Sequence, residues 1–183
     1  MTSASKITVL RILLIPAFMA AMLLEFPYAG ALALGIFIIA GITDIVDGVI
    51  ARNYDQISNF GKFMDPLADK LLMTSAMLIF VQWGRLPAWV VMLVLLREFA
   101  VSGLRMMAAA NGTVIAAGIS GKVKTVVTFV SLCWMISPFY HLNLIGPVTI
   151  DNLAAALILL TTLYSGIEYF LKNHRALTAD PPA

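Results

Sequence analysis

The stretch "DIVDGVIARNYDQISNFGKFMDPLAD", residues 44–69, carries acidic side chains at the edges of two apolar segments. Four of its aspartates flank these segments: Asp44, Asp47, Asp65 and Asp69. A carboxylate near apolar surroundings is unfavourable unless a partner compensates its charge. The sequence must therefore supply counter-charges for these aspartates, or bind ions that do so.

The rest of the chain is far more apolar than a water-soluble domain. Of its 183 residues, 61% are hydrophobic and 12% are charged, whereas soluble domains average about 45–50% apolar and about 25% charged residues. Such a composition suits a bilayer, where lipid replaces water around the protein. The net charge of +2 is too small to indicate nucleic-acid binding, and the single Cys133 cannot form an internal disulfide.

Six segments are long and apolar enough for membrane helices, which need about 20 residues each. They cover residues 5–25, 30–52, 66–84, 87–109, 121–141 and 149–171. The intervening "EFPYAG", "WGRLP" and "YHLNLIGP" carry the Gly and Pro residues of turns. We therefore expect an all-α, polytopic integral membrane protein: one six-helix domain over residues 1–175 and a short polar tail over residues 176–183.

The basic residues predict the orientation, because Lys and Arg gather in cytoplasmic connections. The first and fifth connections carry neither residue, and the third carries only Arg85. The N-terminus, the other connections and the C-terminus hold the remainder, among them Lys6, Arg11, Arg52, Lys62, Lys70, Arg105, Lys122, Lys124, Lys172 and Arg175. Both termini and the aspartate stretch should therefore face the cytoplasm.

Helical geometry groups the four aspartates into two pairs. Residues three and four positions apart share a helix face. One such stripe, near the end of the second segment, consists of Asp44, Asp47, Gly48 and Ala51. Asp65 and Asp69 share a face at the start of the third segment. A hairpin between these segments would bring both pairs together.

Carboxylates in such a group repel one another, and metal ions are one way to compensate them. Hard divalent cations prefer oxygen ligands, and pairs of metals about 3.5–4 Å apart recur in phosphoryl-transfer sites. The pattern favours a metal-dependent site that acts on phosphate groups. Taken singly, Asp65 before Pro66 could cap a helix, and Asp44 or Asp47 could relay protons in a transporter.

The spacing Asp44-x-x-Asp47-Gly48-x-x-Ala51-Arg52, eight residues, Gly61-x-x-x-Asp65-x-x-x-Asp69 resembles the signature of the CDP-alcohol phosphotransferases. The resemblance implies their six-helix fold, a homodimer and two divalent ions, Mg²⁺ or Mn²⁺, held by the four aspartates. Asp69 would also be the general base that deprotonates the acceptor alcohol. The CDP-linked donor would contact Gly48, Ala51, Arg52, Gly61 and Lys70.

Basic residues further along the chain bear on the acceptor. "LREFAVSGLRMMAAANG" (96–112) carries Arg97 and Arg105, and "GISGKVKTVVTF" (118–129) carries Lys122 and Lys124. Arg and Lys converging beside a metal site make a phosphate pocket, which favours an acceptor that itself carries phosphate. Alternatively, Arg97 could pair with Glu98 or another helix, and the two lysines could anchor the helix at the membrane surface.

Two patterns, Arg97-Glu98-Phe99-x-x-Ser102-Gly103-x-Arg105 and Gly121-Lys122-x-Lys124-Thr125, resemble the bacterial phosphatidylglycerophosphate synthases of that family. In "KITVLRILLIPAF" (6–18), Thr8 and Arg11 match as donor contacts, whereas Ala4-Ser5 replaces the usual Pro-Asn. The resemblance implies transfer from CDP-diacylglycerol to sn-glycerol 3-phosphate at the bacterial cytoplasmic membrane, with Ser102 joining the four cations at the acceptor phosphate. Inositol phosphate as the acceptor, an ion-coupled transporter and a structural membrane subunit remain alternatives.

Overall fold

A computed structural model describes residues 3–24, 26–54, 59–110, 115–116, 118–137, 143–145 and 148–174. Within these ranges, the side chains of residues 3–9, 11, 44–54, 59–69, 110, 143–145 and 148 lie outside the description. The structure contains α1 (Ser3–Leu23), α2 (Ala29–Tyr54), α3 (Asn59–Gln82), α4 (Ala88–Ala110), α5 (Ile119–Ile136) and α6 (Ile150–Asn173). A small antiparallel hairpin, β1 (Asn143–Ile145) and β2 (Val148–Thr149), precedes α6.

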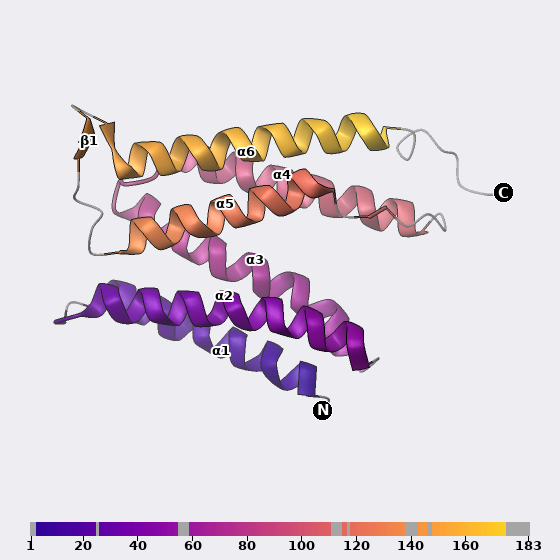
Figure 1. The fold of residues 1–183 in the computed structure, drawn as a ribbon, viewed down its shortest axis with the longest axis horizontal. Helices are drawn as coiled ribbons and strands as arrows, with labels where there is room; N and C mark the ends of the chain where they lie inside the picture. The colour runs from indigo at the N-terminus through magenta and orange to yellow at the C-terminus, as the bar shows by residue number, and fades with distance from the viewer. Residues whose placement is uncertain are drawn as a thin grey trace.

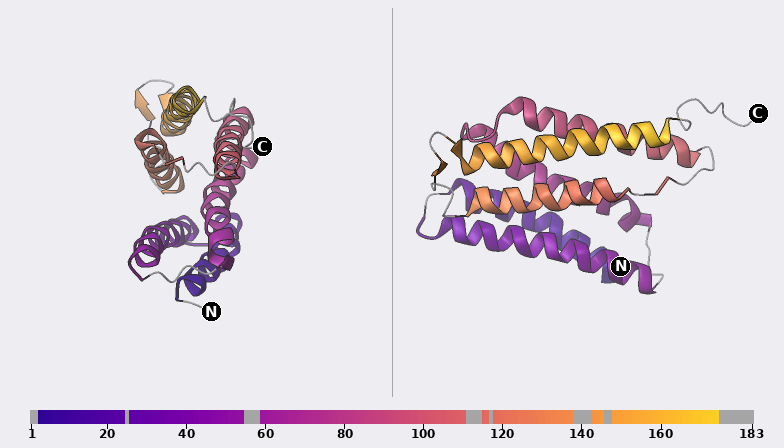
Figure 2. Two further views of the ribbon diagram at one scale, coloured as in Figure 1. Left: turned by 90° about the vertical axis from the view of Figure 1, so that its right-hand side faces the viewer. Right: turned by 45° about the horizontal axis from the view of Figure 1, so that its top comes forward.

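The six helices form two groups that α3 connects (Figures 1 and 2). Helix α1 packs against α2 and α3, while α6 packs against α4 and α5, and α2 also contacts α5. The α1–α2 turn, the α3–α4 turn and the β-hairpin all lie at one end of the bundle (Figure 1). The end of α2 and the start of α3 lie at the opposite end, which is therefore the end that carries the aspartates.

The core is continuous from helix to helix. Phe18 of α1 and Phe37 of α2 are fully buried, with ring centroids 5.3 Å apart, and Phe37 stacks on Phe129 of α5 at 5.1 Å. Gly41 permits this packing, because a Cβ atom there would lie 2.3 Å from Cε2 of Phe129. The aromatic stack and this glycine therefore join the α1–α2 pair to α5.

Large apolar side chains cover the outside of all six helices. Exposed examples, one from each helix in order, are Leu13, Ile39, Leu78, Phe99, Val126 and Leu160. Monomeric soluble proteins do not expose apolar surface so extensively, but lipid solvates it without penalty. The outward faces therefore indicate a membrane protein.

Length and hydropathy single out fewer spans than the six that we expected. Two helices of the described chain are long and apolar enough to cross a membrane, Ile119–Ile136 and Ile150–Asn173. Other apolar helical stretches are shorter: Ile12–Leu23, Ala29–Thr43 and Lys70–Gln82. The charges of Arg97, Glu98 and Arg105 interrupt the apolar run of α4. The number of helices is confirmed, whereas six membrane crossings stay a prediction.

Three local predictions are corrected. Helix α3 begins at Asn59, so Asp65 lies inside the helix and is not its N-cap. Helix α5 ends at Ile136 and not at residue 141, since Ser137 is extended (φ −60°, ψ 151°), as a residue before proline prefers. The segment "YHLNLIGP" contributes to the β-hairpin where we expected only a turn.

An arginine ties elements together at the hairpin end. Arg85, in the turn that Gly84 closes with a φ of +70°, donates from Nε and Nη2 to the two carboxylate oxygens of Asp151, each at 2.8 Å. Nη2 also donates to the carbonyl of Met135 at 2.8 Å, and the guanidinium lies 4.8 Å from the ring centroid of Phe80. This contact joins the α3–α4 turn to the end of α5 and the start of α6.

Candidate active site

The four aspartates lie on two helices that contact each other. Asp44 and Asp47 are in the C-terminal half of α2, with Gly48, Ala51 and Arg52 following them. Gly61, Asp65 and Asp69 are in the first half of α3. The end of α2 and the start of α3 lie at the same end of the molecule (Figure 1). The structure therefore brings the two aspartate-bearing segments together as backbone.

The side chains that would define this site lie outside the described ones. This holds for the four aspartates, for Gly48, Ala51, Arg52 and Gly61, and also for Thr8 and Arg11 of α1. Among the described side chains there is no cluster of three or more His, Cys, Asp or Glu residues. The donor set is nevertheless suited to Mg²⁺ or Mn²⁺, because carboxylate oxygens on two packed helices are hard ligands.

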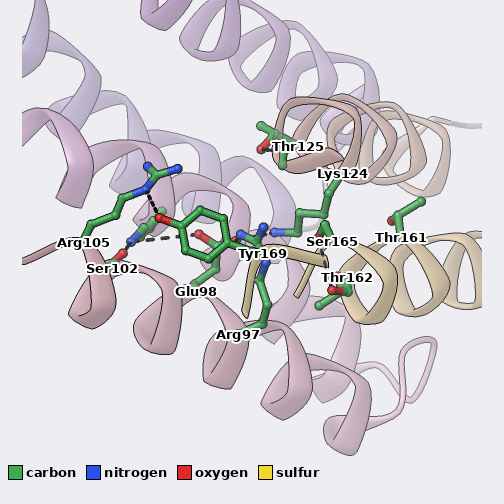
Figure 3. Close-up of polar contacts among 12 residues, drawn as sticks. Arg97, Glu98, Ser102, Arg105, Lys124, Thr125, Thr161, Thr162, Ser165 and Tyr169 are labelled. Atoms are coloured by element: carbon green, nitrogen blue, oxygen red, sulfur yellow. Dashed lines mark hydrogen bonds and ion pairs between the residues drawn. The ribbon is translucent and has the colours of Figure 1, made fainter. Parts of the chain in front are cut away.

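A buried cluster of charged side chains begins at Lys70, the residue of α3 that follows Asp69. Glu98 of α4 accepts from Arg97 Nη1 at 3.0 Å and from Lys124 Nζ of α5 at 2.8 Å, both on Oε1. Lys70 Nζ of α3 lies 3.9 Å from the other carboxylate oxygen and donates to Ser102 Oγ. We call Lys70, Arg97, Glu98 and Lys124 the Glu98 cluster; Figure 3 labels the last three of these residues.

The Glu98 cluster joins α3, α4 and α5, and its positive charges outnumber its negative charge. Lys124 is almost fully buried, with 4% of its surface exposed, and the side chains of Arg97 and Glu98 are 13% and 21% exposed. Three cations against one carboxylate leave a formal charge of +2 within the cluster. In such surroundings charges interact strongly. The cluster is therefore suited to a small dianion.

Arg97 is fitted between α5 and α6. A Cβ atom at Gly166 would lie 3.1 Å from Cγ of Arg97, and one at Gly121 would lie 3.5 Å from Nη2. The buried Nε of Arg97 has no hydrogen-bond partner among the described residues. Two glycines thus leave room for the arginine, and one of its buried donors is without a partner in the described part of the chain.

Arg105 lies eight residues beyond Arg97, about two helical turns further along α4, and has a different partner. Its Nε donates to the hydroxyl of Tyr169 of α6 at 3.0 Å, and its guanidinium carbon lies 5.4 Å from the ring centroid (Figure 3). Lys122 is exposed, and within the described part of the chain it has no hydrogen bond or ion pair from its side chain. Of the expected acceptor residues, Arg97, Ser102 and Lys124 are therefore brought together, whereas Arg105 and Lys122 lie beside them.

The structure gives the site contacts that the sequence did not predict. Glu98 is the centre of the ion pairs, and Lys70, which we expected at the donor, contacts Glu98 and Ser102. A carboxylate inside an apolar segment was the available signal for Glu98, since such a charge requires partners. Tyr169 had no comparable signal, because its contact with Arg105 depends on how α6 packs against α4.

Comparison with known proteins assigns the chain to a family. The CDP-alcohol phosphatidyltransferase family matches residues 1–166. The chain is 42% identical to a CDP-diacylglycerol–glycerol-3-phosphate 3-phosphatidyltransferase of Bacillus subtilis, over 94% of this chain and 95% of that protein. It is 39% identical to a probable phosphatidylglycerophosphate synthase of Mycobacterium tuberculosis, over 94% and 81% of the two chains. This protein belongs to the CDP-alcohol phosphatidyltransferase family.

A third relative extends the agreement to another bacterial group. The chain is 32% identical to a CDP-diacylglycerol–glycerol-3-phosphate 3-phosphatidyltransferase of Rickettsia bellii, over 90% of this chain and 91% of that protein. The family match covers both the aspartate segment and the Glu98 cluster. The chemical class is therefore that of a phosphatidyltransferase, and neither a transporter nor a structural subunit.

Proposed function

We propose that this protein transfers the phosphatidyl group of CDP-diacylglycerol to sn-glycerol 3-phosphate, giving phosphatidylglycerophosphate and CMP. The names of the bacterial relatives support both substrates. The main support for a phosphorylated acceptor is the Glu98 cluster, whose formal charge of +2 matches a phosphate monoester dianion. Inositol phosphate shares that dianion, so the relatives favour glycerol phosphate over it.

Asp44, Asp47, Asp65 and Asp69 would hold two divalent ions, and Thr8, Arg11, Gly48, Ala51, Arg52 and Gly61 would adjoin the CDP-linked donor. When bound, the metals neutralise the charge of the donor pyrophosphate and of the departing phosphate. The carboxylates of α2 and α3 fix where the donor lies. The sequence signature and the contact between these helices support this assignment.

Asp69 would take the proton of the acceptor hydroxyl, as a carboxylate within hydrogen-bond reach can do. The acceptor oxygen then bonds to the phosphorus that carries diacylglycerol, and the bond from that phosphorus to the CMP oxygen breaks. CMP leaves with the electron pair of that bond. Asp69 is suited to this role because the next residue, Lys70, belongs to the Glu98 cluster.

The acceptor phosphate would lie among Arg97, Ser102, Arg105, Lys122 and Lys124. Arginine binds phosphate through two parallel hydrogen bonds and lysine as a point charge. Arg97 retains a buried Nε without a partner in the described chain, which supports a ligand there. Glu98 would keep Lys124 and Arg97 in place until the anion binds.

We further propose a homodimer in the bacterial cytoplasmic membrane, with six membrane crossings in one domain over residues 1–175. The alternation of basic residues supports an active site and termini that face the cytoplasm. The polar residues 176–183, which lie outside the described chain, would extend from that side. The exposed apolar faces of all six helices support the crossings.

The deciding experiment supplies the purified protein with CDP-diacylglycerol, Mg²⁺ or Mn²⁺ and one of several alcohols, and measures CMP and lipid product. We expect release of CMP with sn-glycerol 3-phosphate and its loss when a chelator removes the metal. Absence of CMP with every alcohol would refute the proposed activity. Turnover with inositol phosphate but not with glycerol 3-phosphate would refute the proposal that sn-glycerol 3-phosphate is the acceptor.

The role of Asp69 is tested by Asp69→Asn, which keeps the size of the side chain but removes the base. We expect turnover to fall by at least about 100-fold, in the range that general-base catalysis contributes. Binding of CDP-diacylglycerol, measured by calorimetry in detergent, should largely survive. Full activity in this variant would show that another group takes the proton.

A further inference from the structure

Tyr169 of α6 is a buried tyrosine outside every motif considered above. Only 6% of its surface is exposed, and its ring packs with Val101 and Leu104 of α4. Phe170 contacts the ring edge-on, with centroids 6.4 Å apart. The match to the family ends at residue 166, three residues before this tyrosine. The family signature therefore assigns Tyr169 no role.

The hydroxyl of Tyr169 and its ring hold the same arginine. Arg105 donates from Nε to the hydroxyl at 3.0 Å, and the guanidinium carbon lies 5.4 Å from the ring centroid. A cation near an aromatic face is attracted by the electrons of the ring. Two contacts of different kind thus restrict a side chain that otherwise has many rotamers.

The position of these contacts leaves the rest of the guanidinium available. Nε is occupied by Tyr169, and among the described residues the two terminal nitrogens of Arg105 have no hydrogen-bond partner. In Figure 3 these nitrogens lie on the side of the guanidinium away from the tyrosine hydroxyl. A pair of terminal N–H groups is the part of arginine that binds two oxygens of one phosphate.

We propose that Tyr169 is a positioning residue for the acceptor: it orients Arg105 so that the terminal nitrogens of its guanidinium bind the phosphate of the acceptor alcohol. This inference rests on the proposed role of Arg105 as a phosphate ligand. It adds Tyr169 of α6 to the site, three residues beyond the part of the chain that the family match covers. Tyr169 itself contacts no reacting atom, so it acts on acceptor affinity and not on the chemical step.

The test is Tyr169→Phe, which keeps the ring and its packing and removes only the hydroxyl. We expect the KM for sn-glycerol 3-phosphate to rise about three- to tenfold, the effect of losing one hydrogen bond. The kcat and the KM for CDP-diacylglycerol should stay near the wild-type values. Tyr164→Phe is the matched control, because Tyr164 lies on the same helix with 67% of its surface exposed.

A double-mutant cycle with Arg105→Ala separates positioning from general stability. In the Arg105→Ala background, Tyr169→Phe should change the acceptor KM no further. A binding readout accompanies it: sn-glycerol 3-phosphate should raise the melting temperature of Tyr169→Phe less than that of the wild type.

Several results would overturn the inference. One is an unchanged KM for the acceptor in Tyr169→Phe, and another is an equal rise in KM for both substrates. A third is the same rise in the acceptor KM when Tyr169→Phe is made in the Arg105→Ala background. If Arg105→Ala kept the wild-type KM for the acceptor, Arg105 would not bind the acceptor phosphate, and the inference would lose its basis. In each case CMP release by the wild-type protein would still uphold the proposed function.

Discussion

At the residue scale, Glu98 supplies the negative charge that allows three cations to lie close together. Its carboxylate pairs with Arg97 and Lys124 and lies near Lys70. Removing one partner of a buried ion pair is costly because the remaining charge stays unpaired. Glu98 therefore keeps the cations of the cluster in place. Under the proposed function, an incoming phosphate would add the negative charge that the cluster lacks.

Glu98→Gln should therefore lower the thermal stability of the detergent-solubilised protein, by about 2–4 kcal/mol given its partial burial. Added sn-glycerol 3-phosphate should raise the melting temperature of this variant more than that of the wild type, because the anion replaces the missing carboxylate. The control is Glu168→Gln, whose partner Lys172 is exposed, so this change should lower the melting temperature much less, as expected of an exposed ion pair. A wild-type melting temperature in Glu98→Gln, with an unchanged response to phosphate, would contradict this view.

The sequence was sufficient to find the residues that carry charge, but not their partners. Arg97 and Lys124 were predicted at a phosphate pocket, and they do meet at one carboxylate. The predicted alternative, an Arg97–Glu98 ion pair, is present, whereas the phosphate pocket stays a prediction. Lys70 and Tyr169 could not be placed from the sequence, because their contacts join helices far apart in the chain.

At the element scale, helix existence was predictable and helix ends were less so. Apolar runs located all six helices, and Gly84 marked the turn after α3. The start of α3 was placed too late because Pro66 suggests a first turn, whereas the helix begins at Asn59. Pro66 is therefore the eighth residue of the helix, beyond the first turn, where a proline removes one intrahelical hydrogen bond.

The contact of α2 with α5 provides a test of packing. Gly41→Ala places a methyl group 2.3 Å from the ring of Phe129, which already stacks on Phe37. We expect a loss of about 1–3 kcal/mol in stability from this overpacking, measured as a lower melting temperature in detergent.

Gly35→Ala is the matched control for this change. It lies on the same helix, with nothing within 4 Å of the added Cβ atom. Both variants gain the higher helix propensity of alanine, so their difference isolates the contact with Phe129. Equal melting temperatures for the two variants would contradict the close packing of α2 on α5.

At the scale of the whole molecule, the tryptophans gather at one end of the bundle, where we expect one membrane boundary. Trp83, Trp89 and Trp134 are the three tryptophans of the chain. They follow α3, open α4 and close α5, all at the hairpin end, and each is 43–57% exposed. Tryptophan concentrates at membrane interfaces. At 1.5 Å per residue, Arg97 lies about 12 Å along α4 from Trp89.

This arrangement predicts the depth of the tryptophans in a bilayer. In vesicles, lipids brominated near the head group should quench tryptophan fluorescence more strongly than lipids brominated near the chain ends. The reason is that all three indoles lie at one interface. Variants that keep a single tryptophan should each show the same depth. Stronger quenching from the bilayer centre would contradict the placement of the bundle across the membrane.

Asp69 and Lys70 are consecutive residues of α3, so their Cα atoms are held about 3.8 Å apart by one peptide unit. The backbone positions of the proposed base and of the nearest cation of the Glu98 cluster therefore stay adjacent, whatever the rest of the bundle does. Under the proposed roles, we expect the site to accept an alcohol whose hydroxyl reaches Asp69 while its phosphate reaches the Glu98 cluster. Chain length between the two groups, and not charge alone, would then distinguish glycerol phosphate from longer phosphorylated alcohols.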